Sequence, residues 1–484
     1  MKREEMNFRG RSRITCTIMR SLLTLTLPFF CHYLAAQDTE FRRHCTIDAA
    51  TEADKAFKPR ESSILRESDP LEPDQSMVQF DRFGGTLSAG RRASRFFRTE
   101  KIGDRWWLVT PEGGLSINRS VNSVTLPRSK RGLAAIQKRF GGVEQWEVET
   151  AQVLKNHGFN GTGAWSDTTG MSGETSGLAY CKLWNFMSAY GKQRGGTHQE
   201  AGHTGYPDDC PFIFDPEFVV FCDEHAKQLT EHKNDRWLLG HFSDNELPWK
   251  RSLLKGYLSQ SKKDHGYKAA AAWLKTRLPG TSKAERITEA DEMAFLAYAV
   301  DTYLRIVGTA IRKYDPNHLF LGTRFHGSAL RMPEVFQAAG PHVDVVSVNY
   351  YNSWTPSAER LNMWESESGR PILISEFYSK GNDSGLANTG GAGWIVPTQK
   401  DRGLFYQNFT LALMKSRVCI GWHWHRYADN DPDDVEADSS NKDSNKGIVS
   451  SELEPWTPML EQMQALNQRV HTIIDQLDKS ASAP

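Results

Sequence analysis

Short apolar runs alternate with longer amphipathic stretches from about residue 103 onward. This alternation predicts repeated strand–helix units and a parallel sheet. A helical insertion over 250–313 separates the fourth run from the fifth, and residues 105–114 predict a hairpin that leads into the first. Since eight units close a barrel, we predict an α/β protein with a (β/α)8 TIM barrel. The eight runs cover 115–121, 158–167, 179–185, 237–246, 319–325, 343–351, 371–377 and 418–424.

The N-terminal part of the chain has a different pattern. Basic residues up to Arg20 precede an apolar run over 22–30 and the segment Tyr-Leu-Ala-Ala-Gln at 33–37, which predicts a signal peptide over residues 1–36. Met19 is a second candidate start, and the alternative is a buried N-terminal segment of a cytoplasmic protein. Residues 37–80 are polar and predict an irregular linker, which leaves 81–480 for the barrel. With its leader, the protein is expected to be secreted or periplasmic.

Charge and composition narrow the partners. Basic and acidic residues both number 59, so net charge gives no reason to expect nucleic acid or an anionic membrane as a partner, and a neutral substrate suits this balance. A mean hydropathy of -0.56 argues against an integral membrane protein. The 14 Trp and 14 Tyr residues are side chains that stack on sugars, although most aromatic residues fill cores.

Cysteine and glycine patterns give no sign of a cofactor. Cys16 and Cys31 would leave with the leader, and no pair of the remaining five has CxxC spacing. We expect at most one or two disulfides, with Cys210 and Cys222 close enough in sequence to pair, and no structural zinc. The glycine-rich segment 390–393 lacks the spacing of a dinucleotide fingerprint. No metal and no cofactor are therefore predicted.

Two glutamates end apolar runs. Glu246 ends the fourth run and Glu376 ends the seventh, apart from a closing Phe377. The carboxyl ends of barrel strands form the site in this fold, and strands four and seven face each other across a narrow mouth. Hydrolysis of a glycosidic bond needs one carboxylic acid and one carboxylate, about 5–5.5 Å apart in retaining enzymes. We predict that Glu246 and Glu376 are this pair; the alternative is that each is a salt-bridge partner.

Several segments resemble a known family. Residues 241–249 read His-Phe-Ser-Asp-Asn-Glu-Leu-Pro-Trp, 374–377 read Ile-Ser-Glu-Phe, and 421–429 read Gly-Trp-His-Trp-His-Arg-Tyr-Ala-Asp. Together with 106–113 and 158–160, they resemble clan A glycoside hydrolases, and especially the agarases of glycoside hydrolase family fifty.

The resemblance implies roles and a substrate. Glu246 would be the acid/base and Glu376 the nucleophile of a retaining enzyme that cleaves a neutral β-linked polysaccharide, agarose above all. The alternatives are the same chemistry on mannan or another β-galactan, and a non-catalytic carbohydrate-binding barrel. An acid that works near neutral pH needs a raised pKa, and Phe242 and Trp249 are expected to provide apolar walls for Glu246.

Other residues at the ends of runs predict the rest of the site. Asn245 is expected to bind the sugar 2-hydroxyl beside the scissile bond, or else to be a turn residue that caps a helix. Donors that keep Glu376 ionised are expected at the ends of the fifth and sixth runs, namely Arg324 and Tyr350 or Tyr351. Residues expected to line sugar subsites are Trp165, Asp167, Asn185, His326 and Asn118.

The eighth run alternates indoles and imidazoles. Trp422 and Trp424 share one face of the strand, and we expect this face to meet the barrel mouth, where the indoles stack on sugar; core packing is the alternative. His423 and His425 lie on the other face and are interpreted as structural residues instead of a zinc pair. The acidic stretch 429–438 offers carboxylates for Ca²⁺ but lacks the EF-hand spacing, which favours a solvated loop.

Overall fold

A computed structural model describes residues 41–66, 79–87, 91–167, 170–171, 173–277 and 287–482. The predicted signal peptide over residues 1–36 lies outside these residues. The five cysteines within them, including Cys210 and Cys222, are free thiols, so the pairing considered for those two does not form.

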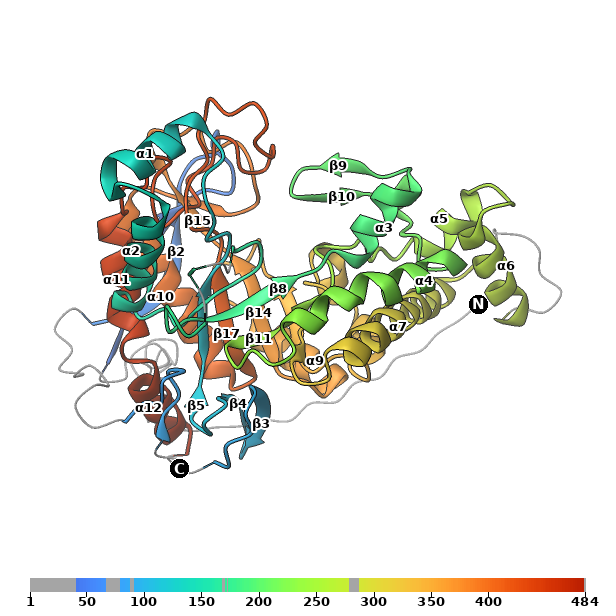
Figure 1. The fold of residues 1–484 in the computed structure, drawn as a ribbon, viewed down its shortest axis with the longest axis horizontal. Coiled ribbons are helices and arrows are strands. Elements are labelled where there is room, and N and C mark those ends of the chain that lie inside the picture. The colour runs from blue at the N-terminus through green and yellow to red at the C-terminus, as the bar shows by residue number, and fades with distance from the viewer. Residues whose placement is uncertain are drawn as a thin grey trace, which may run out of the picture. The chain divides into compact units, whose positions relative to one another are not determined.

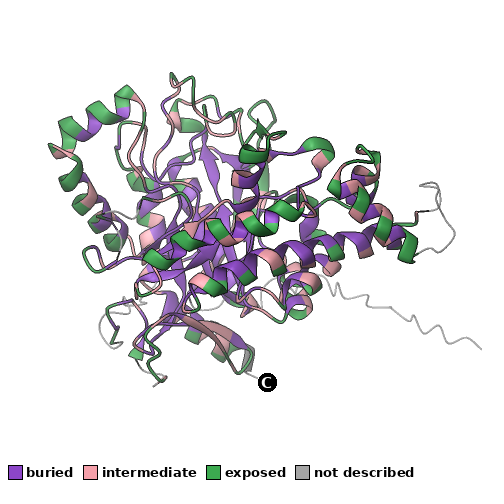
Figure 2. Cartoon of the chain, turned by 45° about the vertical axis from the view of Figure 1, so that its right-hand side comes forward, coloured by how far each residue is buried: buried purple, intermediate pink, exposed green. Residues whose placement is uncertain are grey.

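The predicted barrel is confirmed (Figure 1). Eight strands form one parallel sheet, and a bridge between Phe325 and Val348 joins its two edge strands. Each predicted run contains one barrel strand. The strands are buried except for the last two residues of the third, Lys182 and Leu183, and the exposed faces lie on the surrounding helices (Figure 2). The barrel strands are β6 (Asn118–Val121), β7 (Gly161–Thr162), β8 (Ala179–Leu183), β11 (Leu238–Phe242), β12 (Leu319–Phe320), β13 (Val346–Asn349), β14 (Ile372–Phe377) and β17 (Cys419–Trp424).

Helices follow most of these strands. The described residues between β7 and β8 form no helix, so this unit departs from the ideal alternation. The remaining connections contain α1 (Lys130–Phe140) and α2 (Val143–Asn156) after β6, α3 (Phe186–Arg194) and α4 (Pro216–His225) after β8, α8 (Pro333–Ala339) after β12, α9 (Ala358–Ser368) after β13, α10 (Gln399–Ser416) after β14, and α11 (Thr457–Asn467) and α12 (Val470–Ser482) after β17.

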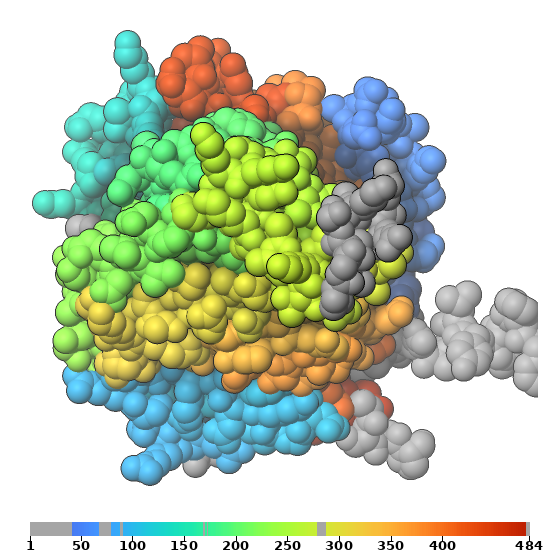
Figure 3. Space-filling view, turned by 90° about the vertical axis from the view of Figure 1, so that its right-hand side faces the viewer, coloured from blue at the N-terminus to red at the C-terminus, as the bar shows by residue number. Residues whose placement is uncertain are grey.

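The helical insertion predicted between the fourth and fifth strands is present. It contains α5 (Leu253–Ser259), α6 (His265–Arg277) and α7 (Glu289–Tyr314), coloured yellow-green to yellow in Figure 3. A capping box at Thr288 and Asp291 begins α7. This helix is long and apolar enough to cross a membrane by length and composition, but 61% of the apolar window is buried inside the protein, as in a core helix.

One small sheet precedes the barrel, and two others lie in its loops. β3 (Arg98–Ile102), β4 (Arg105–Val109) and β5 (Leu115–Ser116) form an antiparallel sheet, so the first predicted run divides between β5 and β6. Two short two-stranded sheets lie in loops: β9 (His198–Glu200) with β10 (His203–Gly205), and β15 (Ser379–Gly381) with β16 (Trp394–Val396).

The prediction of an irregular linker over 37–80 is wrong for part of that stretch. β1 (Arg42–Ala49) and β2 (Lys58–Leu65) form an antiparallel hairpin. The backbone amides of Ser63 and Leu65 donate to the side chains of Asn408 and Gln407 on α10. The hairpin was missed because each strand carries few apolar residues, and its stability comes from packing on α10, which local sequence does not report.

Candidate active site

A cleft of about 860 Å³ contains both predicted acids. Glu246 and Glu376 are 8% and 7% exposed, so each faces the cleft with most of its surface buried. The cleft walls also include residues of the β9–β10 hairpin, of the segment 123–129 and of the loop 425–441. The C-terminal ends of the strands thus build the site, as this fold requires.

Glu246 is held by an anchored backbone. Its φ of 53° lies in the left-handed region, which is uncommon for a residue other than glycine. Two residues earlier, the buried Asp244 accepts hydrogen bonds from the amides of Met187 and Ser188 in the first turn of α3, and from the hydroxyl of Tyr303 on α7. Asp244 therefore fixes the strand end that presents Asn245 and Glu246.

Glu376 lies where two strand pairings shift register. The pairings of β14 with β13 and with β17 are both irregular near Glu376, and such bulges redirect side chains. Arg324 Nη2 donates to Oε2 of Glu376, and the Tyr351 hydroxyl donates to Oε1. Charge-assisted bonds of this kind stabilise the ionised carboxylate.

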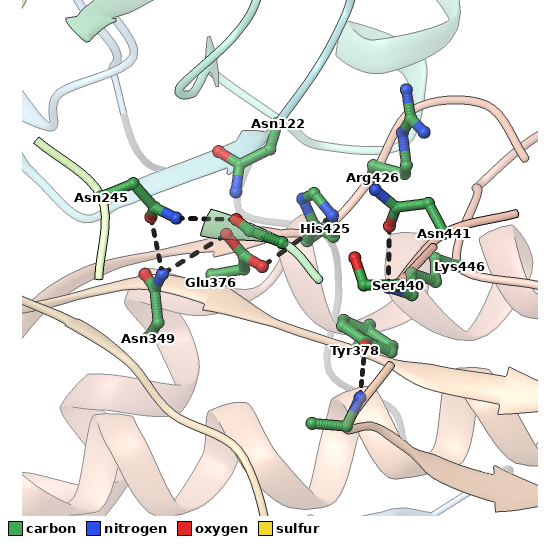
Figure 4. A network of polar contacts seen from close by, with 12 residues as sticks. Asn122, Asn245, Asn349, Glu376, Tyr378, His425, Arg426, Ser440, Asn441 and Lys446 are labelled. Carbon is green, nitrogen blue, oxygen red and sulfur yellow. Dashed lines mark hydrogen bonds and ion pairs between the residues drawn. The ribbon is translucent and has the colours of Figure 1, made fainter. Parts of the chain in front are cut away.

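Asn349 joins the two acids. Its Nδ2 lies 3.5 Å from Glu376 Oε2 and 3.1 Å from Asn245 Oδ1 (Figure 4). The same atom lies 2.8 Å from Glu246 Oε1. A single amide therefore contacts an oxygen of each acid, which places the two carboxyl groups close together at the cleft.

The environments of the two acids differ in their effect on protonation. Burial raises the pKa of Glu246, and the negative charge of Glu376 adds to this against the effect of nearby His326. Burial alone would also raise the pKa of Glu376, but His425, Arg324, the Tyr351 hydroxyl and Lys446 bring it below its ordinary value. Burial lowers the pKa of His425 to about 3, so that ring is neutral at pH 7, and Arg324 is the cation that is hydrogen-bonded to Glu376.

Four of the other predicted site residues line this cleft, namely Trp165, Asp167, His326 and Tyr351. Asn245 and Arg324 are not part of the lining, but both belong to the hydrogen-bonded network around the two acids. Asn245 Oδ1 accepts from Arg324 Nε at 2.8 Å, and the Arg324 guanidinium lies 4.4 Å from the ring centroid of Trp165. Trp165, Glu246 and Arg324 all have positive φ values. Strained backbone conformations of this kind often occur at functional sites.

The expectation that Trp422 and Trp424 meet the barrel mouth is wrong. Both indoles are fully buried; Trp422 Nε1 donates to the hydroxyl of Tyr406 on α10, and Trp424 Nε1 donates to the carbonyl of Lys446. The outer layer has room for two indoles between strand and helix, whereas the barrel interior takes Gly421 and His423. The core-packing alternative therefore describes these residues.

Four further expectations are corrected. The Tyr350 hydroxyl accepts from the backbone amide of Ser357 and does not line the cleft. Asn185 also lies outside the cleft lining, at the start of α3, because its backbone carbonyl begins that helix. Asn118 accepts from His423 Nε2 inside the barrel. Phe242 and Trp249, the expected walls of Glu246, do not line the cleft: the Phe242 ring is 5.3 Å from the Arg324 guanidinium, and Trp249 packs on Tyr303.

Several residues beside the two acids were not predicted. Asn349 is the clearest, since only the two tyrosines of the sixth run were expected in the site. His425 lines the cleft, with Nε2 3.8 Å from Glu376 Oε1 and Nδ1 buried without a partner, so its interpretation as structural is corrected. His203, on the β9–β10 hairpin, places Nδ1 3.9 Å from Glu246 Oε2. The alternation of side chains along the sixth and eighth strands could have indicated Asn349 and His425. No pattern in the sequence indicates His203.

The acidic stretch 429–438 forms part of the cleft wall. Asp429 is buried and accepts from Asn445, Gly447 and Trp456. Asp438 accepts from the amide of Gly202 at the tip of the β9–β10 hairpin. The solvated loop that the sequence favours is therefore tied to its surroundings at both ends.

A buried cluster brings three potential metal ligands within 4.8 Å of one another, namely His241, Asp315 and His318. Asp315 Oδ2 lies 2.8 Å from His241 Nε2 and 2.7 Å from His318 Nδ1. The remaining ring nitrogens contact Trp184 Nε1 and the carbonyl of Asp235. All four nitrogens are engaged within the protein, so the cluster is a hydrogen-bonded network.

Known proteins share this sequence and fold. Beta-agarase B of Vibrio sp. (strain JT0107) is 25% identical over 497 aligned residues, covering 81% of this chain and 50% of that protein. Beta-agarase A of the same strain is 26% identical over 378 residues, covering 68% and 36%. The chain thus spans half or less of the length of these curated relatives. The crystal structure of BpGH50 matches with a TM-score of 0.78 and 26% identity, over 90% of this chain and 96% of that one.

No protein-family model matches the chain. The pairwise similarities nevertheless agree with one another and with the segments singled out in the sequence, and the predicted resemblance is confirmed. In sequence and in fold, this chain resembles the agarases of glycoside hydrolase family fifty.

Proposed function

We propose that the protein is a retaining glycoside hydrolase that cleaves β-glycosidic bonds of a neutral galactan, agarose above all. The observation that carries this proposal is the pairing of Glu246 and Glu376 across one amide, with the pKa of the first raised and that of the second lowered. Two carboxyl groups with opposite shifts are what an acid and a nucleophile require. The similarity to beta-agarases A and B supports a galactan as substrate.

The reaction follows from these roles. Glu246, protonated, gives its proton to the glycosidic oxygen while the Glu376 carboxylate attacks the anomeric carbon, and the bond between that carbon and the leaving oxygen breaks. Glu246, now ionised, takes a proton from water, and the resulting hydroxyl displaces Glu376. Asn245, whose amide is held by Arg324 and Asn349, is proposed to bind the sugar 2-hydroxyl.

Two other functions make different predictions. The same chemistry on mannan or another β-galactan would use the same acids and differ in the cleft walls. A non-catalytic carbohydrate-binding barrel would need the aromatic surface of Trp165 but would have no use for two buried acids. Buried carboxyl groups cost stability, which favours the enzyme.

A panel of polysaccharides tests the proposal. Purified protein is incubated separately with agarose, mannan and another β-linked galactan. The products are sized, and NMR determines the anomeric configuration of the product that is released first. We expect oligosaccharides from agarose with the β-anomer retained. Glu246→Gln and Glu376→Ala should abolish release. Azide should give an α-glycosyl azide in Glu376→Ala, because it attacks from the side that the carboxylate occupied, whereas any glycosyl azide formed by Glu246→Gln should be the β-anomer. Glu365→Gln, outside the cleft, serves as the matched control. No release from any polysaccharide would refute the enzyme, and release from mannan alone would refute the galactan.

We also propose that the protein is secreted or periplasmic, on the basis of the leader pattern at residues 1–36. Mass spectrometry of the protein from its host should find a mature N-terminus at Gln37. An intact N-terminus on protein confined to the cytoplasm would contradict this.

A further inference from the structure

Two cations line the cleft beside Glu376 without an acidic partner of their own, namely Lys446 and Arg426 (Figure 4). Lys446 is 2% exposed; its Nζ donates to Asn441 Oδ1 at 2.7 Å and lies 4.5 Å from the ring centroid of Tyr378. Arg426 Nη1 donates to Asn430 Oδ1, and Nε is buried without a partner. In the described part of the chain, neither cation forms an ion pair with a carboxylate.

The acids nearby are engaged by other donors. Glu376 takes its bonds from Arg324 and Tyr351. Two further acids near these cations are also engaged. Asp438 accepts from Gly202, Gln199 and Ser440. Asp429 accepts from Asn445, Gly447 and Trp456. The positive charges of Lys446 and Arg426 are therefore not neutralised by a direct contact.

Lys380, a second buried lysine, is better supplied with acceptors than Lys446. Lys380 is also buried, but its ammonium donates to three backbone carbonyls, those of Asn388, Gly390 and Gly391. Lys446 has one neutral acceptor for three donor hydrogens. Burial without pairing penalises a charge, and it lowers the pKa of Lys446 to about 7 and that of Arg426 below its ordinary value.

We propose that Lys446 and Arg426 form a subsite for an anionic substituent of the saccharide, either a sulfate ester or a uronate carboxylate, beside the cleavage point. The inference rests on the proposed function, because it assumes that a saccharide occupies the cleft. An anionic substituent in this part of the cleft would be attracted by both positive charges and could form charge-assisted hydrogen bonds with them, as ammonium and guanidinium groups do with sulfate and carboxylate. The site would thus accept galactans whose units carry a charge as well as neutral ones.

Calorimetry with the inactive Glu246→Gln protein tests this subsite. Three agaro-oligosaccharides of equal length are titrated at low salt: one neutral, one with a sulfate ester and one with a uronate carboxylate. We expect at least one charged ligand to bind about tenfold more tightly than the neutral one, since a charge-assisted bond contributes about that factor. In Lys446→Met and in Arg426→Gln, each added to Glu246→Gln, this preference should shrink about tenfold. Arg128→Gln, which changes another cation lining the cleft, should keep it.

The outcomes separate the two proposals. Preference for the sulfate or for the uronate identifies the substituent. Equal affinity for neutral and charged ligands, or a preference that survives in both variants, overturns the subsite while leaving the glycosidase intact. Binding of none of the three overturns the proposed function and the subsite together. Circular dichroism and thermal unfolding confirm that each variant is folded before titration.

Discussion

The side-chain amide of Asn349 donates a 2.8 Å hydrogen bond to Oε1 of Glu246. Its orientation is fixed from the other end, because Ser375 Oγ donates to Asn349 Oδ1 at 2.8 Å. The amide nitrogen therefore faces the acids and the oxygen faces away. A donor to Glu246 stabilises its ionised form, so Asn349 moderates the rise in pKa that burial causes.

Asn349→Ala should lower kcat/KM by about 10- to 100-fold, the effect of losing a hydrogen bond to a charged group. Because the lost bond favours ionised Glu246, the alkaline limb of the pH–rate profile should move to higher pH. Kinetics across pH 4 to 10 measure both effects. Ser375→Ala, which only loosens the amide, should act in the same direction and more weakly. A reduced rate with an unmoved alkaline limb would show that Asn349 acts on something other than Glu246.

The pH dependence of the parent protein should be bell-shaped. Glu376 must be ionised to attack, so activity falls as the pH drops through its lowered pKa, on the acid side of its ordinary 4.5. Glu246 must be protonated, so activity falls as the pH rises through its raised pKa, above 4.5. Profiles of kcat/KM on a soluble oligosaccharide report both limbs. An optimum confined below pH 4.5 would contradict the assignment of the acid.

Arg324→Met removes the cation that is hydrogen-bonded to Glu376. The pKa of Glu376 should rise, which moves the acid limb to higher pH, and kcat should fall by about 10²- to 10³-fold, as when a group that stabilises charge at the reacting centre is lost. Arg324→Lys should recover part of the loss, since it restores the charge but not the paired contacts to Asn245 and Glu376. An acid limb that stays at the same pH in both variants would show that Arg324 does not lower the pKa of Glu376.

Two tryptophans should behave oppositely. Trp424→Ala should lower the free energy of unfolding by about 3–5 kcal/mol, because it empties a buried site. Trp165→Ala, at a residue that is 38% exposed in the cleft, should change stability little and raise KM about tenfold through lost stacking. Thermal unfolding and Michaelis kinetics on both variants make the comparison. A large loss of stability from Trp165→Ala would refute its assignment to the substrate surface.

The barrel and its acids were predictable because both follow from local pattern. Each strand is a short apolar run, and in this fold a polar residue at its end faces the site. Period-two alternation also separated Trp422 and Trp424 from His423 and His425 correctly. The direction of each face was not predictable, since it depends on whether barrel or helix offers more room, and here α10 receives the indoles.

Features that depend on distant segments escaped prediction. Strand alternation places Ser347, Asn349 and Tyr351 on one face of the sixth strand and Tyr350 on the other. Alternation therefore predicts Asn349, and not Tyr350, as a site residue beside Tyr351. His203 comes from a hairpin whose position over Glu246 depends on a contact with the loop at Asp438. No spacing in the sequence encodes that contact.

The anchorage of Asp244 has a consequence for protein design. Its carboxylate is capped by the first turn of α3, which precedes it in the chain, and by Tyr303 of α7, which follows it. Grafting only the end of β11 onto another barrel would leave a buried carboxylate without donors and the glutamate without a fixed direction. The smallest portable unit is therefore the strand end together with that helical turn and that tyrosine.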